Sequence, residues 1–160
     1  MAKAKQSIPA GYHTVTPSII VAGADRALEF YKKALGAEEV MRFPGPDGKI
    51  MHAEMKIGDS LIMLGDEMPE HGGRGPTSYG GTPVSFFVYG DNVDQAWQRA
   101  VAAGAEVVMP LADQFWGDRS GCLKDPFGHN WWLSQHIEDL TPEEMGQRAQ
   151  EFFSSQMQRA

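Results

Sequence analysis

An internal repeat constrains this chain more than any other feature of its sequence. The run Gly36–Met41 (GAEEVM) recurs as Gly104–Met109 (GAEVVM), 68 residues later and identical at five of six positions. A second match, Ala24–Leu28 with Val93–Trp97, has an offset of 69, and a weaker third match has an offset of 70. Three matches in order at a nearly constant spacing predict two similar halves of about 70 residues.

Each half has the residue pattern of a β-α-β-β-β module. Short β-rich runs with alternating apolar residues predict the strands, and apolar residues at helical spacing before a glycine predict the helix. In the first half the expected strands are Thr14–Val21, Glu39–Phe43, Ile50–Ile57 and Ser60–Leu64, with a helix over Asp25–Leu35. In the second half they are Val84–Tyr89, Glu106–Pro110, Gly121–Lys124 and Asn130–Ser134, with a helix over Val93–Ala103.

This pattern predicts one domain over residues 14–137, preceded by an N-terminal arm, 1–13, and followed by a C-terminal helix, 138–160. The modules span 14–64 and 84–137, and the Gly- and Pro-rich segment 65–83 between them is either a plain connector or a lid over a pocket. The helix opens with a capping box, Thr141–Glu144. Its apolar stripe should pack on the domain or against a second chain, and comprises Met145, Ala149, Phe152, Phe153 and Met157.

Composition excludes several classes of partner. The formal net charge of −7 argues against nucleic acid, which requires clustered Lys and Arg. A single cysteine, Cys122, rules out an internal disulfide framework and a Cys-rich zinc site. No apolar run approaches the ~18 residues of a membrane span, and the basic start leads into no apolar signal segment. We therefore expect a cytoplasmic protein that does not bind membranes.

The strands sort their residues into two faces because successive side chains alternate. Met51, Ala53, Met55 and Ile57 should lie under a helix, as should Trp131 and Leu133. The opposite face would then carry His52, Glu54, Phe87, Tyr89 and Trp132. We expect a curled, mixed or antiparallel sheet that places these residues around a ligand cavity. The alternative is that this face is simply exposed to solvent.

Three groups of residues are candidates for chemistry. Trp116–Arg119 (WGDR) suits recognition of a polar planar ligand, or else forms a salt bridge that fixes the loop. His52 and Glu54 share a strand face and are weak candidates for acid–base catalysis. Cys122 is a candidate thiol nucleophile if it faces the cavity, but Lys124 is its only basic neighbour on that face, so we expect a buried small residue instead.

Several motifs resemble the vicinal oxygen chelate superfamily, which contains glyoxalase I, bleomycin-resistance proteins and extradiol dioxygenases. They are the paired modules, Arg26–Tyr31 (RALEFY) closing at Leu35–Gly36, and Asp125–His129 (DPFGH) before the last strand. Met51–Met55 (MHAEM), Gly58–Leu64 (GDSLIML) and Asp113–Arg119 (DQFWGDR) are similar to its PhnB-like branch. The resemblance implies the glyoxalase/bleomycin-resistance fold over roughly residues 14–137, and leaves the chemistry open because one fold hosts many functions.

Enzymes of this superfamily hold a divalent metal with four His or Glu side chains. The resemblance puts the four positions at Thr16, Ile62 or Met63, Ser85 and Trp132, where none of the residues is a competent ligand. It therefore implies a homodimeric, metal-independent protein that binds a small molecule, as in drug or metabolite sequestration, with no cofactor. The expected ligand-binding residues are Trp132, Phe87, Trp116, Tyr89, and Arg119 or Glu54 for charge. The alternative is a glyoxalase-like lyase or isomerase that uses His52 and Glu54 or a displaced metal.

Overall fold

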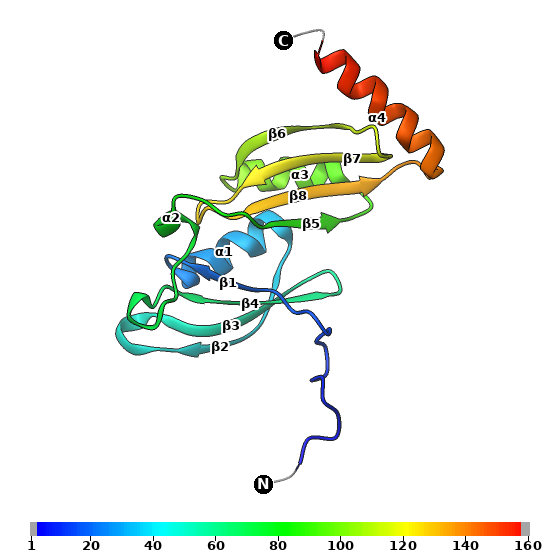
Figure 1. Cartoon of the computed structure of the whole chain (residues 1–160). Coiled ribbons are helices and arrows are strands. Elements are labelled where there is room, and N and C mark those ends of the chain that lie inside the picture. The colour runs from blue at the N-terminus through cyan, green and yellow to red at the C-terminus, as the bar shows by residue number, and fades with distance from the viewer. Residues whose placement is uncertain (1–2, 158–160) are drawn as a thin grey trace. The chain divides into compact units, whose positions relative to one another are not determined.

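The computed structural model describes residues 3–157, and its contacts divide the chain into two compact units. The first unit runs through Thr82 and includes Phe127–His129, and the second comprises Pro83–Pro126 and the chain from Asn130 onward. Each unit is a four-stranded mixed sheet with a helix against one face (Figure 1). This is the α+β architecture of two β-α-β-β-β modules that the repeat predicts.

The first unit contains β1 (Ser18–Val21), α1 (Ala24–Leu35), β2 (Glu38–Pro44), β3 (Ile50–Ile57) and β4 (Ser60–Asp66). The sheet order is β1-β4-β3-β2, with β1 parallel to β4 and the other pairs antiparallel. Gly36 ends α1 in the left-handed conformation (φ 68°) and its N–H bonds the Tyr31 carbonyl. This is the glycine C-cap that the sequence predicts.

Two details of this unit differ from the predictions. The first strand begins at Ser18 rather than Thr14, since Pro17 has no N–H to offer and pairing starts with its carbonyl, which accepts from Met63 N at 2.9 Å. Met51 is 57% exposed rather than packed under the helix. It is the residue that the register skips between the pairs Phe43–His52 and Pro44–Ile50, so it lies in a β-bulge. The predicted turn after β2 contains a 3-10 segment, Pro46–Gly48.

The second unit contains β5 (Ser85–Tyr89), α3 (Val93–Ala102), β6 (Glu106–Asp113), β7 (Asp118–Lys124) and β8 (Asn130–His136). The sheet order is β5-β8-β7-β6, and β5 and β8 are parallel, as β1 and β4 are in the first unit. β6 and β7 are longer than predicted because the turn between them is closed by backbone bonding of Gln114 N to the Asp118 carbonyl (2.7 Å). The longer β7 places Asp118 and Arg119 in the sheet.

The helix side of the second sheet is packed as the alternation predicts. Trp131 and Leu133 are each 2% exposed. Gly121 lies under α3, where a Cβ atom would approach the Trp97 ring to 2.6 Å and the Leu111 backbone to 2.8 Å. A side chain at 121 would therefore displace the helix from the sheet.

The segment between the modules contains short helices, and the turn before β8 is held by a histidine. Residues 65–83 contain a 3-10 segment, Pro69–His71, and α2 (Pro76–Tyr79), and the Glu67 carboxylate accepts from Gly75 N and the Ser78 hydroxyl. His129 Nε2 lies 3.0 Å from the Ile20 carbonyl oxygen, so it ties the turn before β8 to the first unit. The role of residues 65–83 as a lid stays a prediction.

The C-terminal helix α4 (Pro142–Met157) begins with the predicted capping box. Glu144 N donates to the Thr141 hydroxyl, and the Glu144 carboxylate accepts from Thr141 N at 2.8 Å. Its apolar stripe is largely exposed, with Phe153 58% and Met157 81% accessible, although both Phe152 and Phe153 contact the Phe115 ring. Within the described residues, no helix combines the length and apolar character needed to cross a membrane.

Candidate functional site

A row of aromatic rings lies on the face of the second sheet that points away from α3. Phe87 of β5 is paired in register with Trp132 of β8, and their rings are stacked with centroids 5.2 Å apart and planes within 3°. Tyr89, two residues along β5, lies 6.5 Å from Phe87 at an interplanar angle of 23°. Phe87 is 51% exposed and Tyr89 58%. We call Phe87, Tyr89 and Trp132 the aromatic face; it presents flat apolar surface with few polar groups.

A buried carboxylate holds one end of the aromatic face in place. Asp118 is 5% exposed, and its Oδ2 accepts from the Tyr89 hydroxyl at 2.9 Å and from Trp116 Nε1 at 3.2 Å. Its other oxygen, Oδ1, lies 2.8 Å from His136 Nδ1. The Asp118 carboxylate therefore orients three side chains: Trp116 from the loop before β7, Tyr89 from β5 and His136 from β8.

The same carboxylate shifts the pKa values of its neighbours. The hydrogen bond to Asp118, together with one to Asp139, raises the pKa of His136 above its usual value. Burial, then the hydrogen bond to Asp118, raises the pKa of Tyr89. Tyr89 is therefore a neutral phenol at physiological pH, and the cationic form of His136 is favoured.

A hollow of about 310 Å³ opens beside this cluster. Its lining residues are Tyr89, Gly90, Asp91, Gln135 and His136. The hollow adjoins the aromatic face because Tyr89 belongs to both, so polar groups lie at one end of a stacking surface.

The middle of this sheet face is closed by small buried side chains. Ser120 and Ser134 are 0% and 1% exposed, and their hydroxyl oxygens are 2.6 Å apart. Cys122, opposite Trp132, is 4% exposed, and burial raises the pKa of its thiol. A buried neutral thiol is a poor nucleophile, which agrees with its interpretation as a small core residue.

His52 and Glu54 lie together on β3 in the first unit, as the alternation predicts. His52 Nε2 is 3.1 Å from Glu54 Oε1, and the hydroxyl of Tyr12 donates to the same oxygen. Glu54 is 5% exposed. These hydrogen bonds lower the pKa of Glu54, and the one from Tyr12 has the largest effect. The lowered pKa makes the Glu54 carboxylate a weaker base, and acid–base catalysis by this pair stays a prediction.

The structure corrects one predicted site residue. Arg119 does not reach the aromatic face; it points to the helix side of β7, where it binds both oxygens of Asp94 on α3 (2.7 and 2.9 Å) and Asp113 (2.9 Å). The reason is strand alternation: Asp118 occupies the aromatic side, so the next residue must face the other way. The salt-bridge alternative for the WGDR run therefore describes Arg119.

Of the other predicted residues, Trp132, Phe87, Tyr89 and Trp116 come together in the second unit, whereas Glu54 belongs to the first. Sequence reasoning missed Tyr12, Asp118 as the shared acceptor, and His136. Asp118 lies within the WGDR run that the sequence singled out, but Tyr12 is in an arm without periodicity and His136 lies beyond the predicted end of its strand.

The four positions expected for a superfamily metal carry no His, Cys, Asp or Glu side chain. Thr16 precedes β1 and its hydroxyl donates to the His13 carbonyl, while Ser18 is the residue opposite Met63. Of the two alternatives on β4, Met63 shares a pair with Glu54, and Ile62 faces the helix. Among residues 3–157, no three His, Cys, Asp or Glu side chains are grouped closely enough to hold an ion. Hydroxyl, thioether and indole groups do not suit a catalytic divalent metal.

Comparison with known proteins identifies the family. Residues 12–133 match the model of the Glyoxalase/Bleomycin resistance protein/Dioxygenase superfamily. The chain belongs to this superfamily. An uncharacterized protein of Mycobacterium tuberculosis is 46% identical over 134 residues, which cover 82% of this chain and 79% of the relative. The superfamily resemblance drawn from the RALEFY and DPFGH motifs is thus confirmed.

Two solved structures share the fold. The PhnB protein of Bacillus cereus has a TM-score of 0.60 and 19% identity, covering 77% of this chain and 99% of its own. TnmS3 of Streptomyces sp. CB03234, an antibiotic-binding protein, has a TM-score of 0.59 and 22% identity, covering 82% of this chain and 98% of its own. At these identities the similarity concerns the fold.

Proposed function

We propose that this superfamily member is a metal-independent binding protein for a flat aromatic or conjugated small molecule, which it sequesters on the aromatic face of the second unit. The stacked pair Phe87–Trp132 carries the proposal. Its rings are parallel within 3°, and Phe87 leaves half of its surface accessible. A planar ligand gains stacking and apolar contact there without rearrangement of the sheet.

The groups around the aromatic face supply polarity at its edge. The Tyr89 hydroxyl and the Trp116 N–H already donate to Asp118, so they are held in fixed positions. The hollow beside Tyr89 is lined by polar side chains, among them Gln135 and His136, and both ring nitrogens of His136 are held by the carboxylates of Asp118 and Asp139. TnmS3, a solved structure that shares this fold, is an antibiotic-binding protein, which is consistent with this type of ligand.

A thermal-shift screen against planar metabolites and antibiotics tests the proposal, because a ligand that binds only the native state raises the melting temperature. We expect a planar conjugated compound to bind, and Trp132→Ala to weaken its binding more than tenfold. If Trp132 only fills unused space, the variant should lose stability and no compound should bind.

The enzyme alternative rests on the contact between His52 and Glu54. A glyoxalase-like activity with a displaced metal would require that ion to bind through His52. Metal analysis of protein purified without chelator tests this: stoichiometric nickel, zinc, manganese or iron that is lost in His52→Ala would favour the enzyme over the binding protein.

We also propose that the protein is a cytoplasmic homodimer. The exposed stripe on α4, with Phe153 and Met157 largely accessible, supports a role for this helix in covering a partner. The buried free thiol of Cys122 is compatible with a reducing compartment.

A further inference from the structure

The first unit holds a buried carboxylate that the proposed binding site does not use. Glu54 is 5% exposed, and both of its hydrogen-bond partners, the Tyr12 hydroxyl and His52 Nε2, meet the same oxygen, Oε1. Among the described residues the second oxygen, Oε2, has no partner. A carboxylate oxygen accepts more than one hydrogen bond, so Oε2 has unused capacity.

Oε2 is accessible from outside the protein. Within residues 3–157 there is no fully buried side-chain nitrogen or oxygen without a partner. Since Oε2 lacks a partner, it must retain some contact with solvent. The carboxylate is thus hydrogen-bonded through Oε1 and keeps a small solvent contact at Oε2.

Among the described residues no lysine or arginine forms an ion pair with Glu54, and its one basic neighbour at ion-pair distance is His52, at 3.1 Å. Lys56 lies two residues along the same strand face, but the ion pairs of the described residues do not include it. Hydrogen bonds from Tyr12 and His52 lower the pKa of Glu54, so the carboxylate is ionised at neutral pH. A mostly buried anion without a full cationic partner favours a ligand that brings one.

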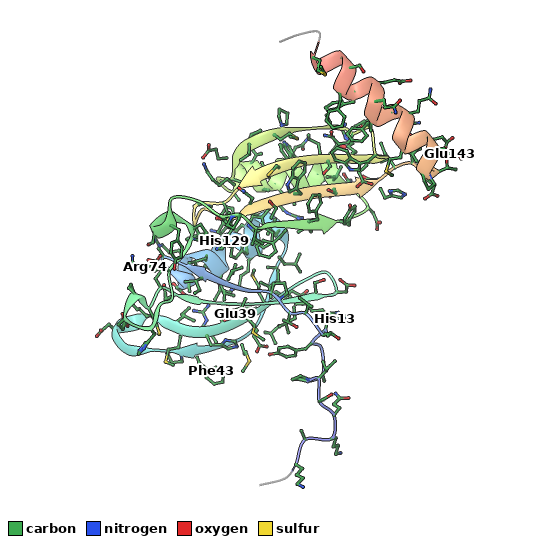
Figure 2. All side chains as sticks on the ribbon, in the orientation of Figure 1. His13, Glu39, Phe43, Arg74, His129 and Glu143 are labelled. Atoms are coloured by element: carbon green, nitrogen blue, oxygen red, sulfur yellow. The ribbon has the colours of Figure 1, made fainter. Side chains whose placement is uncertain are left out.

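The surroundings of Glu54 suit an organic cation better than a hydrated ion. Its cross-strand neighbours on β2 and β4 are Met41 and Met63, whose thioethers are polarizable and apolar. Phe43, 54% exposed on the side of β2 opposite α1 (Figure 2), stacks on His52 with ring centroids 6.3 Å apart. An aromatic ring near a carboxylate attracts an ammonium group through its face.

We propose that this surface, Glu54 with Met41, Phe43, His52 and Met63, binds the primary ammonium group of an amine with an apolar or aromatic substituent. The ammonium donates a hydrogen bond to Glu54 Oε2, and the substituent lies against the methionines and Phe43. A metal ion fits less well, because His52 and Glu54 supply only two of the His, Cys, Asp or Glu ligands that it would need.

An NMR titration of the full chain with 2-phenylethylammonium tests the site. Its readouts are the methyl signals of Met41 and Met63 and the backbone amides of β3. We expect saturable shifts at these positions, at least tenfold weaker binding in Glu54→Gln, and no comparable shifts with the neutral analogue 2-phenylethanol. Glu143→Gln, which removes the same charge from an exposed position on α4 (Figure 2), should bind as the unmodified protein does.

The proposal is overturned if 2-phenylethanol binds as well as the amine, if Glu54→Gln retains full affinity, or if only a divalent cation such as Zn²⁺ perturbs these signals. The comparison of 2-phenylethylammonium with 2-phenylethanol uses unmodified protein, so it still tests the proposal if Glu54→Gln folds poorly. Trp132→Ala should leave these shifts unchanged, which separates this site from the aromatic face.

Discussion

Replacement of Phe87 by alanine tests whether the aromatic face is a binding surface or only part of the core. The Phe87 side chain is 51% exposed. If its full surface is on the order of 200 Å², roughly 100 Å² is buried, worth about 2.5 kcal/mol at ~25 cal/mol per Å², an upper estimate because unfolded chains are partly compact. We therefore expect Phe87→Ala to lower the free energy of unfolding by about 2–3 kcal/mol, including the lost stacking on Trp132.

Such a loss leaves a folded protein whose binding can be measured. At roughly 2–4 °C per kcal/mol for a chain of this size, the melting temperature should fall by about 4–12 °C. Calorimetric titration at 15 °C with a planar compound from the screen should show affinity reduced more than tenfold, a loss of at least ~1.4 kcal/mol.

Phe30→Ala on α1 is the control, because this phenylalanine is also partly exposed and contacts other aromatic rings, and it lies in neither proposed site. This variant should lose stability to a similar extent and keep the affinity of the unmodified protein. Equal affinity losses in both variants, or full affinity in Phe87→Ala, would refute the assignment of the aromatic face as the binding surface.

Three further predictions follow from the same structure. Asp118→Ala leaves the donors of Tyr89 and Trp116 without their acceptor, so chemical denaturation should show a loss of about 2–4 kcal/mol, against under 0.5 for an exposed carboxylate. The raised pKa of His136 implies stabilisation that is present in full below its unfolded value and lost as pH rises through the folded value. The melting-temperature difference between unmodified protein and His136→Asn should therefore shrink above neutral pH, and a pH-independent difference would contradict this. Deletion of residues 141–160 should cause dissociation or aggregation in size-exclusion chromatography, and a soluble dimer would exclude this role for α4.

Local chemistry was enough to predict most of the elements of this protein. The repeat of Gly36–Met41 at Gly104–Met109, the alternation of apolar residues and the glycine after α1 predict two β-α-β-β-β modules, and the structure contains them. The capping box at Thr141 was also predictable. Each of these features depends on interactions between residues a few positions apart, so it can be predicted from a short stretch of the sequence.

Strand register and long-range hydrogen bonds were decided only by the tertiary structure. The alternation put Phe87 and Trp132 on one face. Their position directly opposite each other depends on the parallel pairing of β5 with β8, whose paired residues are 45 positions apart in the sequence. The extension of β7 through Asp118 reversed the roles expected within the WGDR run, since it turned Arg119 toward α3 and Asp118 toward the aromatic rings.

The contact of Tyr12, in the N-terminal arm, was also decided only by the tertiary structure. It lies outside any periodic segment, and its hydroxyl bonds a carboxylate 42 positions away. Sequence alone determined which side chains a regular strand presents on each face, because alternation is a property of the single strand, and it failed at Met51, where a β-bulge interrupts the alternation. Tertiary structure decided which of them meet, because that depends on pairing between strands and on loops that close at a distance.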